Sequence, residues 1–151
     1  MYQPSDITLA LALTKNKKNT IISTTRGQLS FGLFPANNHG FTTGKIILKL
    51  GLIGHGYFRK GAFGVRHIWE KHGGEIGLTS PIQVVNFIES ILIPGAEVIL
   101  NREKSPDKPI IVESSNGLIT LGLTTFKNQV AYSIITAYDR KNHPGVVIAT
   151  I

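Results

Sequence analysis

The stretch 109–125, PIIVESSNGLITLGLTT, holds the strongest local signal for the fold class of this chain. Two runs rich in β-branched and aliphatic residues, 109–114 and 118–125, flank the tripeptide Ser115-Asn116-Gly117. An Asn-Gly pair between two such runs is the strongest short signal for a β-hairpin, because both residues tolerate the positive φ of a tight turn. The stretch therefore predicts two antiparallel strands joined by a short turn.

Further segments with strand composition extend this hairpin in both directions. Segment 96–101 precedes the hairpin, and segments 129–138 and 145–151 follow it. Nearer the N-terminus lie segments 7–14, 20–25, 28–34 and 45–53. The first of these, ITLALALT, also allows a short helix capped by Ser5. Polar segments at 15–19, 102–108 and 139–143 are expected to be turns or loops.

Two short helices are expected between the strands. The first spans about 62–72 and should end at Gly73-Gly74, where a left-handed cap is favoured. The second follows Ser80, a natural N-cap, and Pro81, which suits the first helical position, and it stops before Pro94-Gly95. Strands followed by helices and then by a run of strands indicate an α+β fold: an antiparallel β-meander with two short helices packed on one face, preceded by a β-rich N-terminal extension.

The composition favours one globular domain with a basic N-terminal part. The chain has 151 residues, no cysteine and a net charge of +7. Residues 1–60 hold eight Lys or Arg and one acid, whereas residues 61–151 hold eight of each, so the whole excess lies in the first part. We therefore expect a single domain, 1–151, made of a basic extension (1–44) and a core (45–151). A basic region favours a polyanionic partner, nucleic acid first.

The helix expected at 62–72 carries two histidines. At about 100° per residue, His72 shares the apolar face of Val65, Ile68 and Trp69, while His67 lies about 140° away among Arg66, Glu70 and Lys71. A helix C-terminus favours a cationic His72, a general acid, and neighbouring cations favour a neutral His67, a base. In a regular helix the two rings point apart, so acting on one phosphate would need a break in the helix or a contribution from His55.

Other interpretations of these histidines stay open. His72 also fits a structural histidine at a helix–sheet junction, and His67 a surface histidine. A zinc site is disfavoured, because the two histidines are five residues apart rather than the four of an H-E-x-x-H helix and there is no cysteine.

Two further groups of residues suggest contact with RNA. In a regular strand, Tyr132, Ile134, Thr136 and Tyr138 would line one face, which offers a hydroxyl between aromatic rings. Ordinary β-propensity explains the same run. The basic N-terminal part and the glycine-rich loop 54–61 supply candidate RNA-binding side chains: Lys45, Lys49, His55, Arg59 and Lys60.

The strand and glycine at 45–51, the H-I-x-x-K-H pattern at 67–72 and the T-A-Y pattern at 136–138 resemble the BECR nucleases, the barnase–EndoU–colicin–RelE group. These occur as phage-head nuclease domains and as C-terminal toxins of contact-dependent inhibition systems. The resemblance covers roughly residues 45–140. It implies a ribonuclease without metal or other cofactor, often acting on tRNA, with His67, His72 and Thr136 in the active site and Arg66, Lys71 and Tyr138 in support.

The expected function is thus cleavage of RNA by general acid/base transesterification. The resemblance further implies action in the cytoplasm, delivery into target cells as the C-terminal part of a larger secreted protein, and an acidic immunity protein as partner. A non-catalytic nucleic-acid-binding or phage structural module remains the alternative, and a protein-binding inhibitor is a third. Nothing in the composition indicates a membrane-spanning segment.

Overall fold

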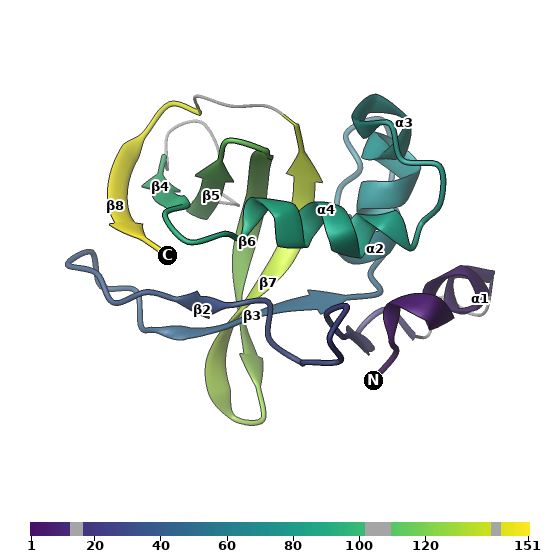
Figure 1. Cartoon of the computed structure of the whole chain (residues 1–151), viewed down its shortest axis with the longest axis horizontal. Helices are drawn as coiled ribbons and strands as arrows, with labels where there is room; N and C mark the ends of the chain where they lie inside the picture. Colours follow the sequence, from purple (N-terminus) through teal and green to yellow (C-terminus); the bar gives the residue numbers. More distant parts are fainter. Residues whose placement is uncertain (13–16, 102–109, 140–142) are drawn as a thin grey trace.

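A computed structural model describes residues 1–12, 17–101, 110–139 and 143–151, and it confirms the α+β fold (Figure 1). The predicted loop at 102–108 and parts of those at 15–19 and 139–143 lie outside the described residues. The helices are α1 (Ile7–Ala12), α2 (Gly64–His67), α3 (Gly73–Ile76) and α4 (Gln83–Ile91), with a 3₁₀ turn at Pro4–Asp6 and a π-helical turn at Ile68–His72. The strands are β1 (Ile21–Ile22), β2 (Leu33–Phe34), β3 (Gly44–Lys49), β4 (Glu97–Leu100), β5 (Ile110–Ser114), β6 (Gly117–Phe126), β7 (Gln129–Tyr138) and β8 (Val146–Thr150).

The strands form one mostly antiparallel sheet in the order β1-β3-β7-β6-β5-β4-β8, with β2 paired to β3. Strands β4 to β7 make the predicted meander, and β6 begins at Gly117 of the Asn-Gly turn. Strand β3 pairs with β7 in parallel, which the sequence did not indicate because parallel partners are far apart in the chain. This pairing runs only from Lys45↔Ala131 to Ile47↔Ser133. Beyond it, α2 and the π-turn pack against the rest of β7.

The prediction of a strand at 7–14 is wrong for residues 7–12, and residues 13 and 14 lie outside the described residues. Residues Ile7–Ala12 are helical, which the alternative of a short helix allowed, and Ser5 lies inside the preceding 3₁₀ turn rather than at the cap. Ile7 and Ala10, three residues apart, are the buried side chains, so the helix packs one face on the core. The N-terminal segment shares its buried cluster with the rest of the chain through Ile7, Ala10, Ile22, Phe31 and Phe34.

Helix α4 lies across the front of the sheet and closes the main core (Figure 1). Its buried side chains Val84, Val85, Ile88 and Ile91 recur at helical spacing. The helix begins at Gln83, later than Ser80-Pro81, because a turn precedes it in which the Ile82 N–H donates to the Ser80 hydroxyl. Within the described residues no helix has the length and apolar character needed to cross a membrane.

The Tyr132 side chain connects the sheet core to the N-terminal segment. It is fully buried, its ring stacks on Phe34 with centroids 4.1 Å apart, and its hydroxyl donates to the Thr42 carbonyl. Burial raises the pKa of this phenol above its ordinary value of 10.0. Above about pH 10 the unfolded chain therefore loses a proton that the folded chain keeps, so stability falls as the pH rises through this window.

We expect Tyr132→Phe to lower the free energy of unfolding by about 1 kcal/mol below pH 10, through loss of the hydrogen bond to Thr42. The difference between wild type and variant should shrink as the pH rises above 10, because the phenylalanine has no proton to lose. Urea unfolding of wild type and variant at a series of pH values measures the difference below pH 10 and its decrease above pH 10. A difference that stays constant to high pH would show that the buried phenol does not set this slope.

Candidate functional site

The helix that carries the two histidines is not regular, and this changes where they point. Between α2 and α3, residues Ile68–His72 form a π-turn, in which backbone hydrogen bonds join residues five apart instead of four. His67 and His72 are separated by five residues, so the turn places one above the other. Their ring centroids lie 5.4 Å apart with the planes at 87°. The prediction that the rings point apart is therefore wrong, because it assumed an α-helical period throughout.

The start of this helix is fixed by close backbone contact with the end of β3. Gly64 has a φ of 78°, and a Cβ there would lie 2.4 Å from the Lys49 carbonyl oxygen. Gly51 is as constrained, since a Cβ would overlap the Phe63 carbonyl. The Arg66 N–H donates to the Leu50 carbonyl at 2.8 Å. Only glycine permits this approach, so the two glycines set the position of the histidines relative to the sheet.

The helix also runs past its predicted end at Gly73-Gly74. It continues to Ile76 and closes at Gly77, which has a φ of 85°. Gly73 stays helical beneath the Trp69 ring, where a Cβ would lie 2.8 Å from Cε3. His72 is consequently inside the helix and not at its C-terminus, the position predicted from the sequence.

His72 is instead oriented by a carboxylate and an aromatic ring. Its Nδ1 lies 2.9 Å from Oε2 of Glu75, an exposed residue one turn further on. Its ring meets the Tyr138 ring edge to face, with centroids 4.8 Å apart at 76°. An ionised Glu75 accepts the Nδ1–H, which leaves Nε2 as the His72 atom that can exchange a proton. Tyr138, at the end of β7, thus joins the two histidines in one cluster.

Thr136 lies on β7 close to this cluster but not on the predicted face. The β6–β7 register steps from Thr120↔Thr136 to Leu121↔Ile134, so Ile135 is an extra residue, a β-bulge. The bulge reverses the alternation: Tyr132 and Ile134 belong to the main core, whereas Thr136 and Tyr138 fall on the opposite face. The prediction that these four residues line one face is wrong for this reason.

The opposite face holds a pair of buried hydroxyls. Thr120 and Thr136 are cross-strand neighbours that are 4% and 3% exposed. Among the described residues, neither Oγ1 has a hydrogen-bond partner. A buried hydroxyl without a hydrogen-bond partner costs free energy, so this pair is an unfavourable polar feature of that face.

The two cations expected to support the histidines behave differently. Arg66 donates from Nη1 to the Leu11 carbonyl at 3.0 Å, so its guanidinium is turned toward α1. With His55 it lines a hollow of about 200 Å³ beside residues 52–54. Lys71 is exposed on the outer surface of the π-turn. Arg66 is therefore a link between α1 and α2, and Lys71 is the cation left on the accessible side.

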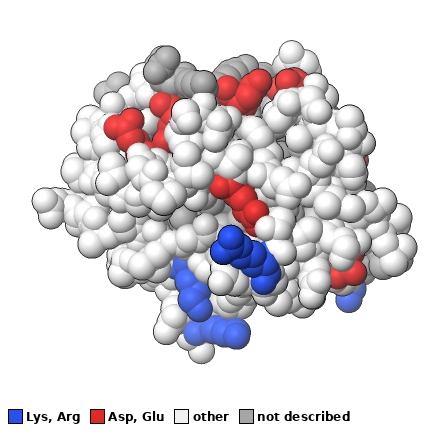
Figure 2. Space-filling model, in the orientation of Figure 1, with Lys and Arg blue, Asp and Glu red and all other residues white. Residues whose placement is uncertain are grey.

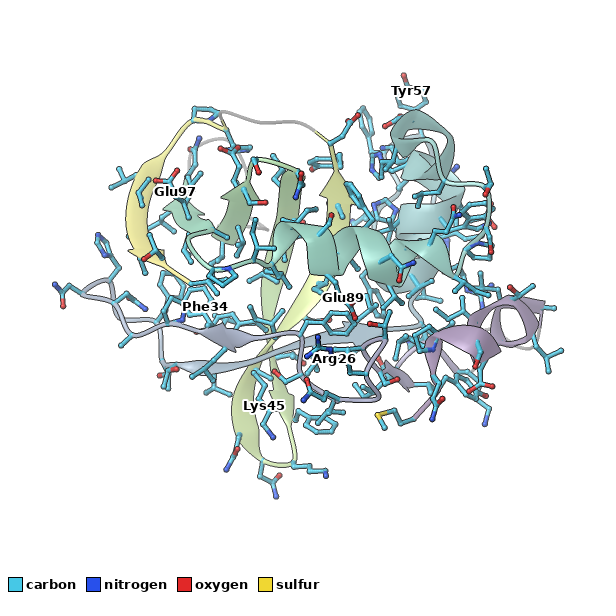
Figure 3. All side chains as sticks on the ribbon, in the orientation of Figure 1. Arg26, Phe34, Lys45, Tyr57, Glu89 and Glu97 are labelled. Carbon is cyan, nitrogen blue, oxygen red and sulfur yellow. The ribbon has the colours of Figure 1, made fainter. Side chains whose placement is uncertain are left out.

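The predicted RNA-binding residues fall into two separate groups. Lys45 and Lys49 project from β3 on the same face as Ile47, and burial lowers the pKa of Lys49. His55, Arg59 and Lys60 belong to a hairpin at residues 52–63. Figure 3 shows Lys45 and Tyr57, at the tip of that hairpin, at opposite ends of the molecule. In Figure 2, Lys and Arg gather at the lower end of the visible face, and Asp and Glu lie mostly across the upper part.

Sequence reasoning missed two exposed aromatic residues in this hairpin. Only the polar side chains around them were predicted to contact RNA, yet Tyr57 and Phe58 are 91% and 86% exposed. The signal was present as two aromatics between Gly56 and Arg59-Lys60, a combination that a core does not need.

Within the described residues no group of three or more His, Cys, Asp or Glu is placed to hold a metal ion. Comparison with protein-family models, with curated proteins and with solved structures gives no significant match for this chain.

The close approach of Gly64 to β3 gives a direct test of how the histidines are positioned. We expect Gly64→Ala to lower the free energy of unfolding by at least about 2 kcal/mol, because the new methyl group meets the Lys49 carbonyl and the φ is positive. Gly74→Ala is the matched control, since nothing lies within 4 Å of its Cβ. It should be neutral or stabilising by up to about 1 kcal/mol. Equal effects of the two changes in urea unfolding would contradict this view of the helix.

Proposed function

We propose that this chain is a metal-independent endoribonuclease in which His67 and His72 exchange protons with RNA. The observation that carries the proposal is the contact between the two imidazoles, 5.4 Å apart, with one of them oriented by Glu75. Transesterification of RNA needs a base for the 2′-hydroxyl proton and an acid for the leaving 5′-oxygen. Two adjacent imidazoles, one neutral and one protonated, supply both.

The orientation of His72 suggests how the roles divide. With Nδ1–H held by Glu75, Nε2 of His72 accepts the 2′-hydroxyl proton, as in other carboxylate–histidine pairs, which reverses the roles expected from the sequence. His67 then donates the proton to the leaving 5′-oxygen. The 2′-oxygen forms a bond to phosphorus as the bond to the 5′-oxygen breaks, which yields a 2′,3′-cyclic phosphate and a 5′-hydroxyl. The Thr136 hydroxyl and the exposed Lys71 are the candidates to stabilise the negative charge on the phosphate.

The motif resemblance to BECR nucleases extends the proposal beyond the chemistry. It supports tRNA as the substrate, action in the cytoplasm of a target cell after delivery as part of a larger protein, and inhibition by an acidic immunity protein. The formal charge of +7 is consistent with both an RNA substrate and an acidic inhibitor.

One observation favours a second candidate, a non-catalytic RNA-binding module. His67 and His72 are only 4% and 7% exposed, so a phosphodiester reaches them only if the surrounding side chains move. Buried histidines that pack on each other and on Tyr138 also suit a structural role. In that case the exposed aromatic side chains Tyr57 and Phe58, with the cations next to them, would bind RNA without cleaving it.

Incubation of the purified protein with tRNA and with total RNA in EDTA separates the two candidates. The ribonuclease proposal expects cleavage that leaves 2′,3′-cyclic phosphate ends. His67→Asn and His72→Asn should each lower the rate by about 10²–10⁴-fold, the usual contribution of general acid or base catalysis. His39→Asn, which changes an exposed histidine in the loop before β3, should leave the rate unchanged.

Thermal unfolding of each variant shows whether a reduced rate reflects disrupted structure. Glu75→Gln is a second check, because Glu75 is exposed and its change should leave the fold intact while lowering the rate about tenfold or more through loss of the His72 tautomer that Glu75 holds. No cleavage by the folded wild type, together with salt-sensitive RNA binding that survives both histidine changes, would replace the ribonuclease proposal with the binding module.

A further inference from the structure

The hairpin at residues 52–63 has a rigid base and an exposed aromatic tip. His55 and Lys60 exchange two backbone hydrogen bonds of 2.9 Å, and Leu52 and Phe63 form a second bridge next to α2. Residues 56–59, between His55 and Lys60, reverse the direction of the chain. The hairpin is therefore held at its base by paired backbone and by attachment to the helix that carries the histidines.

The tip presents two aromatic rings to solvent. Tyr57 and Phe58 are 91% and 86% exposed, and their rings stand at 89° with centroids 5.2 Å apart. Figure 3 shows Tyr57 pointing away from the body of the protein. Two rings so exposed add nothing to the core, and exposing them to water is unfavourable, so a partner that covers them is the simplest reason for their presence.

The hairpin uses positive φ angles at Gly54 and Arg59. Arg59 has a φ of 54°, which is uncommon for a residue other than glycine. Gly54 has a φ of 86°, and a Cβ there would lie 2.6 Å from the Arg59 carbonyl oxygen.

The cations next to the rings in the chain and a hollow beside the tip suit a single-stranded polyanion. His55, Arg59 and Lys60 flank the rings, and residues 51–69 contain no Asp or Glu. Beside the tip, a hollow of about 540 Å³ is lined by Phe58, Arg59, Lys60, Phe63 and Ile135. Ile135 is the bulged residue of β7 and immediately precedes Thr136. The hollow therefore runs from the aromatic tip to the strand of the candidate site.

We propose that Tyr57 and Phe58 form a stacking site for the bases of single-stranded RNA, with Arg59 and Lys60 contacting the adjoining phosphates. The inference rests on the proposed function for its substrate class and adds a substrate-binding site outside the catalytic residues. Bases stack on aromatic rings whatever their sequence, and cations along the strand neutralise phosphates. Two aromatic side chains offer little apolar area for membrane anchoring, and the adjoining hollow suits an extended strand better than a lipid surface.

Binding of a labelled single-stranded 2′-O-methyl oligonucleotide tests the inference independently of cleavage, because this probe lacks the attacking hydroxyl. We expect Tyr57→Ala/Phe58→Ala to weaken binding by at least about tenfold, as removal of base stacking does. Tyr57→Leu/Phe58→Leu should weaken binding nearly as much, because leucine keeps the apolar area without the π-face. Log affinity falls as log salt rises, and Arg59→Gln/Lys60→Gln should make this fall less steep. The size of the slope should decrease by about 0.7 for each phosphate that the two cations no longer neutralise.

Val146→Ala/Val147→Ala is the matched control, since these side chains on β8 are also exposed, at 62% and 48%, and should leave affinity unchanged. Unchanged RNA affinity in the Tyr57/Phe58 alanine variant would overturn the inference, even if the wild type cleaves RNA. The inference would also be overturned if the leucine variant kept the RNA affinity of the wild type and still bound anionic lipid vesicles. If the wild type binds the probe through the rings but cleaves nothing, the stacking site stands and the ribonuclease proposal fails.

Discussion

The arrangement of the candidate site depends on one constraint, the contact between the backbone at residues 49–52 and the backbone at residues 63–66. Gly51 and Gly64 leave room for it, and the Arg66 N–H donates to the Leu50 carbonyl across it. The contact fixes the base of the aromatic hairpin and the start of the histidine helix at once. Because β3 pairs with β7, it also sets both relative to the strand that carries Thr136. A few tight backbone approaches thus position the aromatic hairpin and the histidine helix relative to Thr136, which is distant from both in sequence.

Much of the fold could be predicted because local signals agreed with the final structure. The Asn-Gly turn and the alternating segments around it gave β5 to β8 close to their observed bounds. The prediction failed at Ile7–Ala12, where one pattern of apolar residues suits a strand or a short helix, and tertiary packing of Ile7 and Ala10 selects the helix. The parallel β3–β7 pairing had no local signal at all.

The errors at the candidate site share a physical origin: one residue too many for the regular period. The π-turn adds a residue to the helix and brings His67 and His72 together, and the bulge at Ile135 adds one to β7 and moves Thr136 to the other face. A helical wheel and a strand alternation both assume a constant period, so neither could find these positions. Tyr57 and Phe58 could be singled out from the sequence, because two aromatic residues stand directly before two cations.

In the proposed mechanism the paired histidines lie where RNA binds. The most direct measurement is the NMR spectrum of the imidazole rings during titration with a non-cleavable 2′-O-methyl oligonucleotide. Our interpretation predicts ring-to-ring contacts between His67 and His72 in the free protein, and shifts of both rings together as RNA is added. The contrary result is that the imidazole signals stay unchanged at saturating RNA while the signals of Tyr57, Phe58 and the lysine side chains shift. The histidines would then have a structural role.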